Sequence, residues 1–355
     1  MKLYAVIMAG GVGSRFWPRS REKTPKQLLK IFGEITMIQA TVKRLESIIS
    51  AENIFIITNK IQSEGIKGQL AQIPVENIVE EPFGKNTAAC IGVASLMIKE
   101  KDPDAVTIVL PADHIIRDED IFTSILKKAS EFAYKSNGLV TIGIPPTRPE
   151  TGYGYIQIDD NETSENIHKV LTFAEKPNYS TAVKFLESGD FLWNSGMFIW
   201  KVESILDEIK IHMHDLYYEL EHLRPHCFKP SFDEMMLKVY GQLKSISIDY
   251  GIMEKSKQVF LIKGTFSWSD VGSWEEVYQL SEKNERGNSC VGNVFTELTN
   301  DSYIYSPDKF TAVIGLDNII VINTDDALLV CRRDQSQEVK KVYDYLKHSK
   351  LNEFL

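Results

Sequence analysis

The stretch MAGGVGSRFWPRSREKTPKQ joins three glycines to a group of cationic residues, directly after an apolar run. Gly10, Gly11 and Gly13 permit positive φ angles and let backbone N–H groups approach an anion closely. Arg15 can bind a phosphate through two hydrogen bonds, and Lys26 can act as a point charge. The stretch is therefore predicted to bind phosphate groups, although a glycine turn with solvated surface cations would have the same composition.

Two well-known phosphate-binding loops do not fit this stretch. The dinucleotide fingerprint needs a glycine three residues after Gly13, where the chain has Phe16, and a Walker A loop needs a final Gly-Lys-Ser/Thr. Pro18 and Pro25 restrict the backbone ahead of Lys26, which favours a fixed position for its ammonium group. The failed fingerprint also argues against an NAD-dependent dehydrogenase.

Two aspartates are candidate ligands of a divalent cation. Asp113 follows a strand-like run, and a carboxylate beside phosphates is reasonable as a ligand of Mg²⁺, which prefers carboxylate and phosphate oxygens. Its alternative role is to cap a helix expected near 119–134. Asp270 lies in FSWSDVGSW, a turn entering a helix, so capping and metal binding are both open for it. His114 is interpreted as structural.

Further polar residues follow other short strands. In EEPFGKNTAAC, Asn86 is predicted to be the N-cap of a helix with Thr87 at its first position. Either Glu80 or Glu81 could accept two hydrogen bonds from the N1–H and N2–H₂ donors of guanine. Three later segments, TGYGY, FAEKP and LWNSGMFIW, mix polar residues into strand-like runs. There Glu175 and Asn194 suit sugar hydroxyls and Lys176 suits a phosphate, although each alone could be a turn or edge-strand residue.

The elements that carry these residues alternate along the first 145 residues. Short apolar runs, separated by helix-like stretches, predict a doubly wound and mainly parallel α/β sheet of Rossmann-like type. Ligands bind such sheets at the carboxyl ends of the strands. The expected strands are 3–8, 54–58, 106–110 and 139–144, and the expected helices are 36–48, 86–100 and 120–134.

The pattern changes twice towards the C-terminus. From 150 to 275, strands at 153–158, 167–174, 196–201 and 259–263 mix with helices at 180–188, 203–224 and 232–241. After about 285, closely spaced short strands predict a small β domain, either a roll or a partial β-helix, and an amphipathic helix at about 335–348. We expect a catalytic domain over 1–284 and a small β domain with its C-terminal helix over 285–355.

Composition excludes several classes of partner. The net charge of −9 argues against general binding to nucleic acid or to anionic membranes. The chain contains four well-separated cysteines without a CxxC pair, which fits a reducing compartment. We expect a cytoplasmic protein, since the sequence shows neither a signal peptide nor a membrane span.

Taken together, these motifs resemble the mannose-1-phosphate guanylyltransferase family. GGVGSRFWPRSREKTPKQ is similar to the family pattern GGxGTRLWPxSRxxxPKQ, with Ser14 for Thr and Phe16 for Leu. EPFGKNTA, LPADH, TGYGYI, FAEKP, WNSGMF, SIDYGIMEK and WSDVGSW follow in family order over about residues 1–330. The resemblance implies a nucleotide-diphospho-sugar transferase fold followed by a small β domain.

The resemblance also implies roles for single residues. It places Asp113 and Asp270 on a shared Mg²⁺ and Arg15 and Lys26 on the triphosphate of GTP, beside the loop residues Gly10, Gly11, Gly13 and Ser14. It places Glu81, Asn86 and Thr87 at the base, with Glu81 preferred to Glu80. It places Gly154, Glu175, Lys176 and Asn194 around mannose 1-phosphate, with Lys176 among the catalytic residues.

The expected reaction is GTP plus α-D-mannose 1-phosphate giving GDP-mannose and pyrophosphate. One alternative is the same chemistry with another nucleotide or sugar phosphate, such as a manno-heptose 1-phosphate. Another is a sensor that binds nucleotide sugars without turnover. We expect a homodimer formed through the C-terminal region. Longer relatives carry an added isomerase domain, so we expect no phosphomannose isomerase activity from this short form.

Overall fold

The computed structural model describes residues 1–164 and 166–355, with residues 160–164 as backbone only. The chain forms two compact units, and each has its own sheet and apolar core. The first unit consists of Met1–Gly10, Thr41–Ala112 and Ile116–Trp268, and the second of Gly11–Ala40, Asp113–Ile115 and Ser269–Leu355. The two-residue strands β5 (Ile115–Ile116) and β11 (Trp268–Ser269) lie where the chain passes from one unit to the other.

The first unit is built on a nine-stranded sheet with the order β3-β2-β1-β4-β9-β6-β10-β8-β7. Strands β1 to β4 are mutually parallel, β6 is parallel to β10, and β9 runs antiparallel between β4 and β6. The predicted doubly wound, mainly parallel sheet is thus confirmed. The strands are β1 (Leu3–Met8), β2 (Ile54–Asn59), β3 (Ile78–Glu81), β4 (Val106–Pro111), β6 (Leu139–Ile144), β7 (Tyr155–Ser164), β8 (Ile167–Ala174), β9 (Phe191–Lys201) and β10 (Val259–Lys263).

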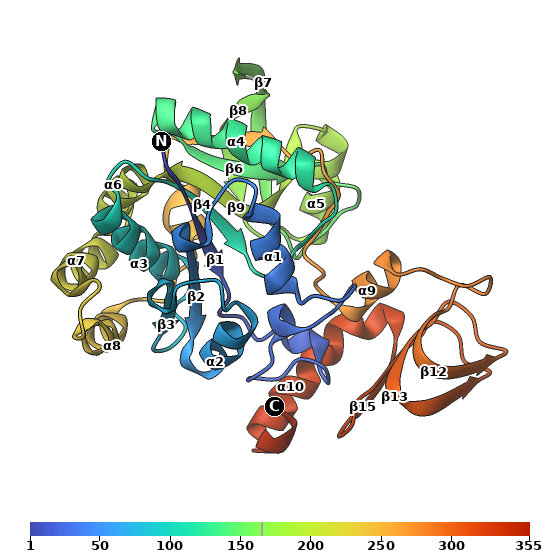
Figure 1. Ribbon diagram of the computed structural model, residues 1–355. Helices are drawn as coiled ribbons and strands as arrows, with labels where there is room; N and C mark the ends of the chain where they lie inside the picture. The colour runs from blue at the N-terminus through green and yellow to red at the C-terminus, as the bar shows by residue number, and fades with distance from the viewer. Residues whose placement is uncertain (165) are drawn as a thin grey trace. The chain divides into compact units, whose positions relative to one another are not determined.

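Helices pack on this sheet because its central strands are apolar on both faces. Figure 1 shows α4 running across the sheet, and α3, α6, α7 and α8 gathered together apart from α4. The helix α1 begins in the second unit and ends in the first. The helices are α1 (Met37–Leu45), α2 (Lys60–Gln69), α3 (Asn86–Lys101), α4 (Glu119–Ser136), α5 (Tyr179–Ser188), α6 (Val202–His212), α7 (His214–Leu223) and α8 (Phe232–Gln242).

Three elements differ from their sequence predictions. The helix expected over 203–224 is two helices, because Met213 between them has the non-helical angles φ −137° and ψ 60°. Strand β9 begins at Phe191 rather than at 196. Helix α2 was not predicted, since Gly65 and Gly68 weaken its pattern, but the side chain of Asn59 caps it by accepting hydrogen bonds from two backbone amides.

No helix in the described part of the chain is both long enough and apolar enough to cross a membrane.

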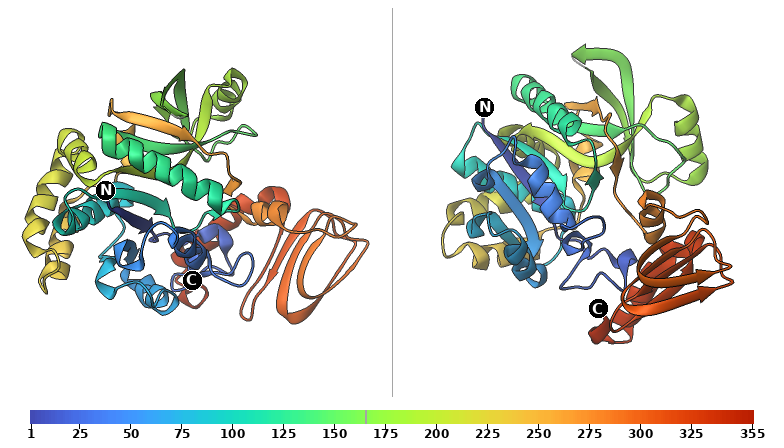
Figure 2. Two further views of the ribbon diagram at one scale, coloured as in Figure 1. Left: turned by 45° about the horizontal axis from the view of Figure 1, so that its top comes forward. Right: turned by 45° about the vertical axis from the view of Figure 1, so that its right-hand side comes forward.

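The second unit contains a four-stranded sheet with the order β12-β13-β14-β15, whose curved strands are orange to red in Figure 2. The first three strands are parallel, and β15 is antiparallel to β14. Two separately predicted runs, SYIYS and TAVIGL, belong to the single long strand β13, which pairs with β12 across a register shift. The strands are β12 (Ser289–Glu297), β13 (Tyr303–Ile314), β14 (Ile319–Asn323) and β15 (Leu328–Arg332).

The core of the second unit joins the N-terminal loop to this sheet. Phe16 and Trp274 are both buried, and their ring centroids lie 4.9 Å apart. Trp274 opens the helix α9 (Trp274–Leu280), and its Nε1 donates to the carbonyl of Trp17 at 3.1 Å. Helix α10 (Val339–His348) buries its apolar face in the same cluster. The burial of this face stabilises the segment that follows the glycines.

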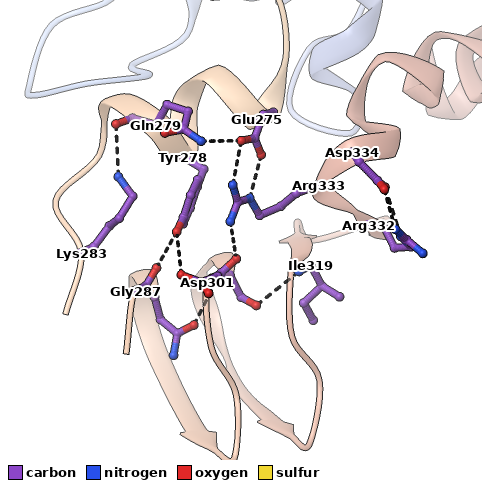
Figure 3. A network of polar contacts seen from close by, with 12 residues as sticks. Glu275, Tyr278, Gln279, Lys283, Gly287, Asp301, Ile319, Arg332, Arg333 and Asp334 are labelled. Atoms are coloured by element: carbon purple, nitrogen blue, oxygen red, sulfur yellow. Dashed lines mark hydrogen bonds and ion pairs between the residues drawn. The ribbon is translucent and has the colours of Figure 1, made fainter. Parts of the chain in front are cut away.

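Arg333 links α9 to the loops of the small sheet (Figure 3). Its guanidinium makes two hydrogen bonds of 2.8 Å to the carboxylate of Glu275 and one of 2.9 Å to the carbonyl of Asp301. The same group lies 3.7 Å from the ring centroid of Tyr278, whose hydroxyl donates to the carbonyl of Gly287 at 2.9 Å. This network fixes the position of α9, which begins four residues after Asp270.

Candidate active site

The glycine loop packs against the end of its own sequence motif. Gly13 has φ +69°, and a Cβ added there would lie 2.4 Å from the Cβ of Lys26. The hydroxyl of Ser20 donates to the carbonyl of Gly13 at 2.7 Å, and Nε2 of Gln27 donates to the carbonyl of Gly11 at 3.0 Å. Only glycine permits this approach at position 13. The loop and Lys26 therefore form one packed structure.

Lys26 connects the two predicted metal ligands. Although its side chain is only 5% exposed, its Nζ lies 2.9 Å from Oδ2 of Asp113 and also donates to the backbone carbonyl of Asp270. Burial alone would raise the pKa of Asp113, but Lys26 and His114 together hold it below its ordinary value. Asp113 is therefore a carboxylate at neutral pH, as binding of a cation requires.

These groups surround one cavity of about 250 Å³. Gly13 and Ser14 of the predicted loop, both cations and both aspartates contribute to its lining, whereas Gly10 and Gly11 do not. His114, which the sequence alone suggests to be structural, lines it as well. Within residues 1–164 and 166–355, no cluster of three or more His, Cys, Asp or Glu side chains could hold a metal alone. Two carboxylates with phosphate oxygens completing the shell are a donor set that suits Mg²⁺. The lining residues are Gly13, Ser14, Arg15, Phe16, Lys26, Asp113, His114, Asp270, Val271 and Gly272.

Neither aspartate occupies a helix N-cap position. The N-cap residue of α4 is Asp118, and that of α9 is Ser273. Next to Asp270, the fully buried Val271 has φ +47°, a left-handed conformation that is rare for a β-branched residue. Such strain persists only where the surrounding packing imposes it. The turn after Asp270 is thus held in shape by the core around it.

In the first unit, Glu81 lies at the end of β3, beside Gly10 at the start of the glycine loop. Its Oε1 accepts a 3.0 Å hydrogen bond from the hydroxyl of Tyr240, and a Cβ on Gly10 would lie 3.3 Å from its Oε2. Burial raises the pKa of Glu81 to about 7. Glu80 is engaged elsewhere, since its Oε1 accepts from Ser63 at 2.6 Å and from Lys67 at 3.0 Å. Both carboxylates therefore have partners, and Glu81 is the one that lies beside Gly10 of the glycine loop.

The start of α3 differs slightly from the prediction. The helix begins at Asn86, and Lys85 takes the N-cap position without a side-chain cap. Asn86 has φ +66°, and its Oδ1 accepts from the amide of Thr87 at 2.8 Å. The hydroxyl of Thr87 in turn accepts from the amide of Ile248 at 2.8 Å. Asn86 is thus one residue beyond the N-cap, yet its side chain still satisfies an amide at the helix start.

The residues predicted to bind the sugar phosphate also meet within the first unit. A Cβ on Gly154 would lie 2.5 Å from Oε2 of Glu175, and the carbonyl of Gly154 accepts from the amide of Asn194 at 2.8 Å. Lys176 lies with its Nζ 2.9 Å from Oε1 of Glu175, which raises the pKa of the lysine. Nδ2 of Asn194 donates to Oδ1 of Asp249 at 2.8 Å.

Sequence reasoning missed two residues of these clusters. Asp249 stands in the motif SIDYGIMEK, so an aspartate within a matching segment was the available signal. Tyr240 lies on α8, far along the chain from Glu81, and nothing in its local sequence indicates the contact.

Comparison with known proteins identifies the family of this chain. The nucleotidyl transferase family model matches residues 4–287, and a model described as a MannoseP isomerase/GMP-like beta-helix domain matches residues 292–346. A mannose-1-phosphate guanylyltransferase of Salmonella typhimurium is 40% identical over 100% of this chain and 74% of its own length. The chain belongs to the mannose-1-phosphate guanylyltransferase family. The predicted resemblance is thereby confirmed.

Other relatives agree with this membership of the guanylyltransferase family. The Salmonella muenchen protein of the same name is also 40% identical, over 99% of this chain and 75% of its own length. A solved structure from Thermus thermophilus, named mannose-1-phosphate geranyltransferase, is 30% identical and superposes with a TM-score of 0.89 over 98% of this chain and 100% of that one. The expected order, a nucleotidyl transferase fold and then a small β-helix-like domain, is confirmed.

Proposed function

We propose that this chain transfers a guanylyl group from GTP to α-D-mannose 1-phosphate, giving GDP-mannose and pyrophosphate. The observation that carries the proposal is the cavity where Lys26 joins Asp113 to Asp270 beside the glycine loop and Arg15. Phosphoryl-transfer catalysis depends mainly on positioning and on charge stabilisation, and this cavity supplies groups for both. Family membership supports the identity of the two substrates.

In the proposed reaction, a phosphate oxygen of the sugar attacks the α-phosphorus of GTP. The new O–P bond forms as the bond from the α-phosphorus to the bridging oxygen breaks, and that oxygen leaves with pyrophosphate. The sugar phosphate is already ionised near neutral pH, so no strong general base is required. The charged side chains that line the cavity, Arg15, Lys26, Asp113 and Asp270, suit a charge-stabilising role, and His114 lies beside them.

The main obstacle is repulsion between two polyanions. Two unit charges about 4 Å apart repel by about 1 kcal/mol in water and by several times more in a partly closed site. Arg15 and Lys26 would neutralise the triphosphate, and Lys176 the sugar phosphate. Because the approaching anion competes for Lys26 and Lys176, the ion pairs they make with Asp113 and Glu175 would be exchanged for phosphate contacts.

Asp113 and Asp270 would hold Mg²⁺ together with phosphate oxygens. When bound there, the ion stabilises negative charge on the α-phosphate and on the departing pyrophosphate. The low pKa of Asp113 supports this role, since the carboxylate stays ionised. Lys26 already places its ammonium group beside Oδ2 of Asp113, so the surroundings of this oxygen suit a cation.

For the remaining contacts, Glu81, Asn86 and Thr87 would bind the guanine, and Gly154, Glu175 and Asn194 the mannose. Gly10, Gly11, Gly13 and Ser14 would offer backbone and hydroxyl donors to the phosphates. We further propose a cytoplasmic homodimer, and a division of the chain into domains 1–284 and 285–355.

The deciding experiment measures pyrophosphate release with GTP and mannose 1-phosphate, with and without Mg²⁺. We expect release only when all three are present, and slower release with ATP or with another sugar 1-phosphate. Binding of GTP without any pyrophosphate release would contradict the proposal and favour a sensor.

A further inference from the structure

Asp249 is a carboxylate that the proposed reaction leaves without a role. It opens a π-helical turn over Asp249–Met253, and π-helical turns occur frequently at functional sites. Burial raises the pKa of Asp249 to about 6, and the nearby carboxylate of Glu175 adds to the effect. Withdrawing a carboxylate from water is unfavourable unless its partners compensate. The partner that the structure gives its side chain is the amide of Asn194.

The side-chain amide of Asn194 is held at both ends. Its Nδ2 donates to Oδ1 of Asp249 at 2.8 Å, and its Oδ1 accepts from the amide of Gly196 at 3.1 Å. Only the amide nitrogen can donate to a carboxylate, and only the oxygen can accept from a backbone N–H. These two contacts therefore fix which way the amide group points. One N–H of Nδ2 and one lone pair of Oδ1 remain for a ligand.

The surroundings of this amide suit a hydroxyl-bearing ligand. The backbone amide of Asn194 donates to Gly154, whose missing side chain leaves room for the carboxylate of Glu175. A sugar hydroxyl both donates and accepts, so it can donate to Glu175 and accept from the remaining N–H of Asn194. A misdirected amide would present an acceptor where the sugar needs a donor.

We propose that Asp249 is a positioning residue of the sugar-phosphate site, which orients the amide of Asn194 so that its second N–H donates to one hydroxyl of the sugar. This inference rests on the proposed function. It predicts selectivity for that hydroxyl, because a site built to hydrogen-bond a hydroxyl strongly rejects the analogue that lacks it.

The test compares Asp249→Leu with Asp249→Asn. Leucine removes the acceptor of the Asn194 amide, whereas asparagine keeps an acceptor oxygen and loses only the charge. We expect Asp249→Leu to raise KM for mannose 1-phosphate by about 10- to 100-fold, equivalent to about 1.4–2.7 kcal/mol. We expect Asp249→Asn to recover most of this loss. The affinity for GTP, measured without sugar phosphate, should remain that of the wild type for both variants.

Two further measurements separate positioning from a general structural effect. A panel of 2-, 3-, 4- and 6-deoxymannose 1-phosphates should show strong discrimination at one hydroxyl in the wild type, and Asp249→Leu should reduce it at that hydroxyl alone. In a double-mutant cycle, the variant that carries both Asp249→Leu and Asn194→Leu should have no higher KM for mannose 1-phosphate than Asn194→Leu alone. Melting curves of all variants check that each one folds.

The inference is overturned if Asp249→Leu leaves KM and the deoxy-sugar pattern unchanged. It is also overturned if the effects of Asp249→Leu and Asn194→Leu on KM are additive in the double variant. It is also overturned if Asp249→Asn is as damaging as Asp249→Leu, since the charge itself would then be what matters. An active wild type with these results refutes only the role of Asp249. A wild type that does not turn over mannose 1-phosphate refutes the proposed function and this inference together.

Discussion

Asp270 is the second proposed ligand of Mg²⁺, and it is not the N-cap of α9, which is Ser273. If it binds Mg²⁺, Asp270→Asn replaces a carboxylate by a neutral amide, a poorer ligand for a hard cation. Losing one preorganised electrostatic contact of about 3–4 kcal/mol lowers turnover by roughly 10²–10³. We therefore expect this fall with little change in melting temperature, and partial recovery at high Mg²⁺ or Mn²⁺. Near-normal turnover at low Mg²⁺ would leave Asp113 as the sole carboxylate ligand.

Selection of guanine should depend on Glu81. The carboxylate can accept from both N1–H and N2–H₂ of guanine, and losing a charged hydrogen-bond partner costs about 1.5–3 kcal/mol. Glu81→Gln should therefore narrow the preference for GTP over ATP, measured as the ratio of kcat/KM values. Glu80→Gln is the matched control, because the carboxylate of Glu80 is engaged with Ser63 and Lys67. If the control narrows the preference instead, the base contact belongs to Glu80.

The same carboxylate predicts a pH dependence of GTP binding. Burial raises the pKa of Glu81 to about 7, whereas guanine requires the ionised form. Below pH 7, GTP binding must release a proton, so affinity should fall by up to about tenfold per pH unit as the pH decreases. Above pH 7, affinity should level off. Titration of GTP itself cancels when wild type is compared with Glu81→Gln, and parallel profiles for the two would contradict the assignment.

Val271 offers a test of backbone strain beside Asp270. A left-handed conformation costs a residue with a Cβ about 1–2 kcal/mol, which glycine avoids. Val271→Gly should therefore be more stable to urea than Val271→Ala. Val277 is an equally buried valine within helix α9, where alanine should be more stable than glycine by about 1 kcal/mol. If the alanine variant is more stable than the glycine variant at both positions, the backbone of Val271 is not strained.

At the scale of elements, the position of α9 depends on the ion pair of Arg333 with Glu275. The side chain of Arg333 is 17% exposed and that of Arg332 is 74% exposed. Arg333→Met should lower the free energy of unfolding by about 1.5–3 kcal/mol, because it removes charge-assisted hydrogen bonds and leaves Glu275 unpaired.

Arg332→Met is the matched control for this change. It removes only the exposed pair with Asp334 and should cost less than about 1 kcal/mol. Figure 3 shows both pairs on adjacent residues. Denaturant melts of the two variants give the comparison. Equal decreases in the free energy of unfolding would contradict a special role for Arg333.

At the scale of the whole molecule, the small sheet carries exposed apolar residues that a second copy could cover. Phe310 and Ile314 on β13 are 75% and 61% exposed, and Leu328 and Val330 on the edge strand β15 are 57% and 55% exposed. Exposed apolar patches and uncovered edges favour association. In contrast, the apolar face of α10 is buried within its own unit, so the exposed residues of the sheet are the first candidates for the proposed interface.

The proposed homodimer can therefore be tested without truncation, which would expose the core that α10 covers. We expect light scattering to give a dimer at micromolar concentration, and Phe310→Lys combined with Ile314→Lys to shift it to monomer. The control is Ile211→Lys, at a comparably exposed position on α6. A monodisperse wild-type monomer would rule the dimer out.

The class of fold could be predicted from the sequence, and so could the residue types proposed for the site. Alternating apolar runs and helical stretches are local patterns, so they predict a parallel sheet without knowledge of contacts. The glycine loop is also a local feature, because Gly13 and Lys26 belong to one short motif and pack on each other. Where local signals were weak, as at α2 and Met213, the prediction missed the element or its break.

Contacts between residues far apart in the chain could not be predicted from the sequence. Lys26 bonds to both Asp113 and the backbone of Asp270, and no local pattern encodes that convergence. The contact of Tyr240 with Glu81 and that of Asn194 with Asp249 likewise join residues that lie far apart in the chain. The physical reason is that hydrogen bonds and burial act between residues adjacent in space. A sequence pattern reports only the neighbours of each residue along the chain.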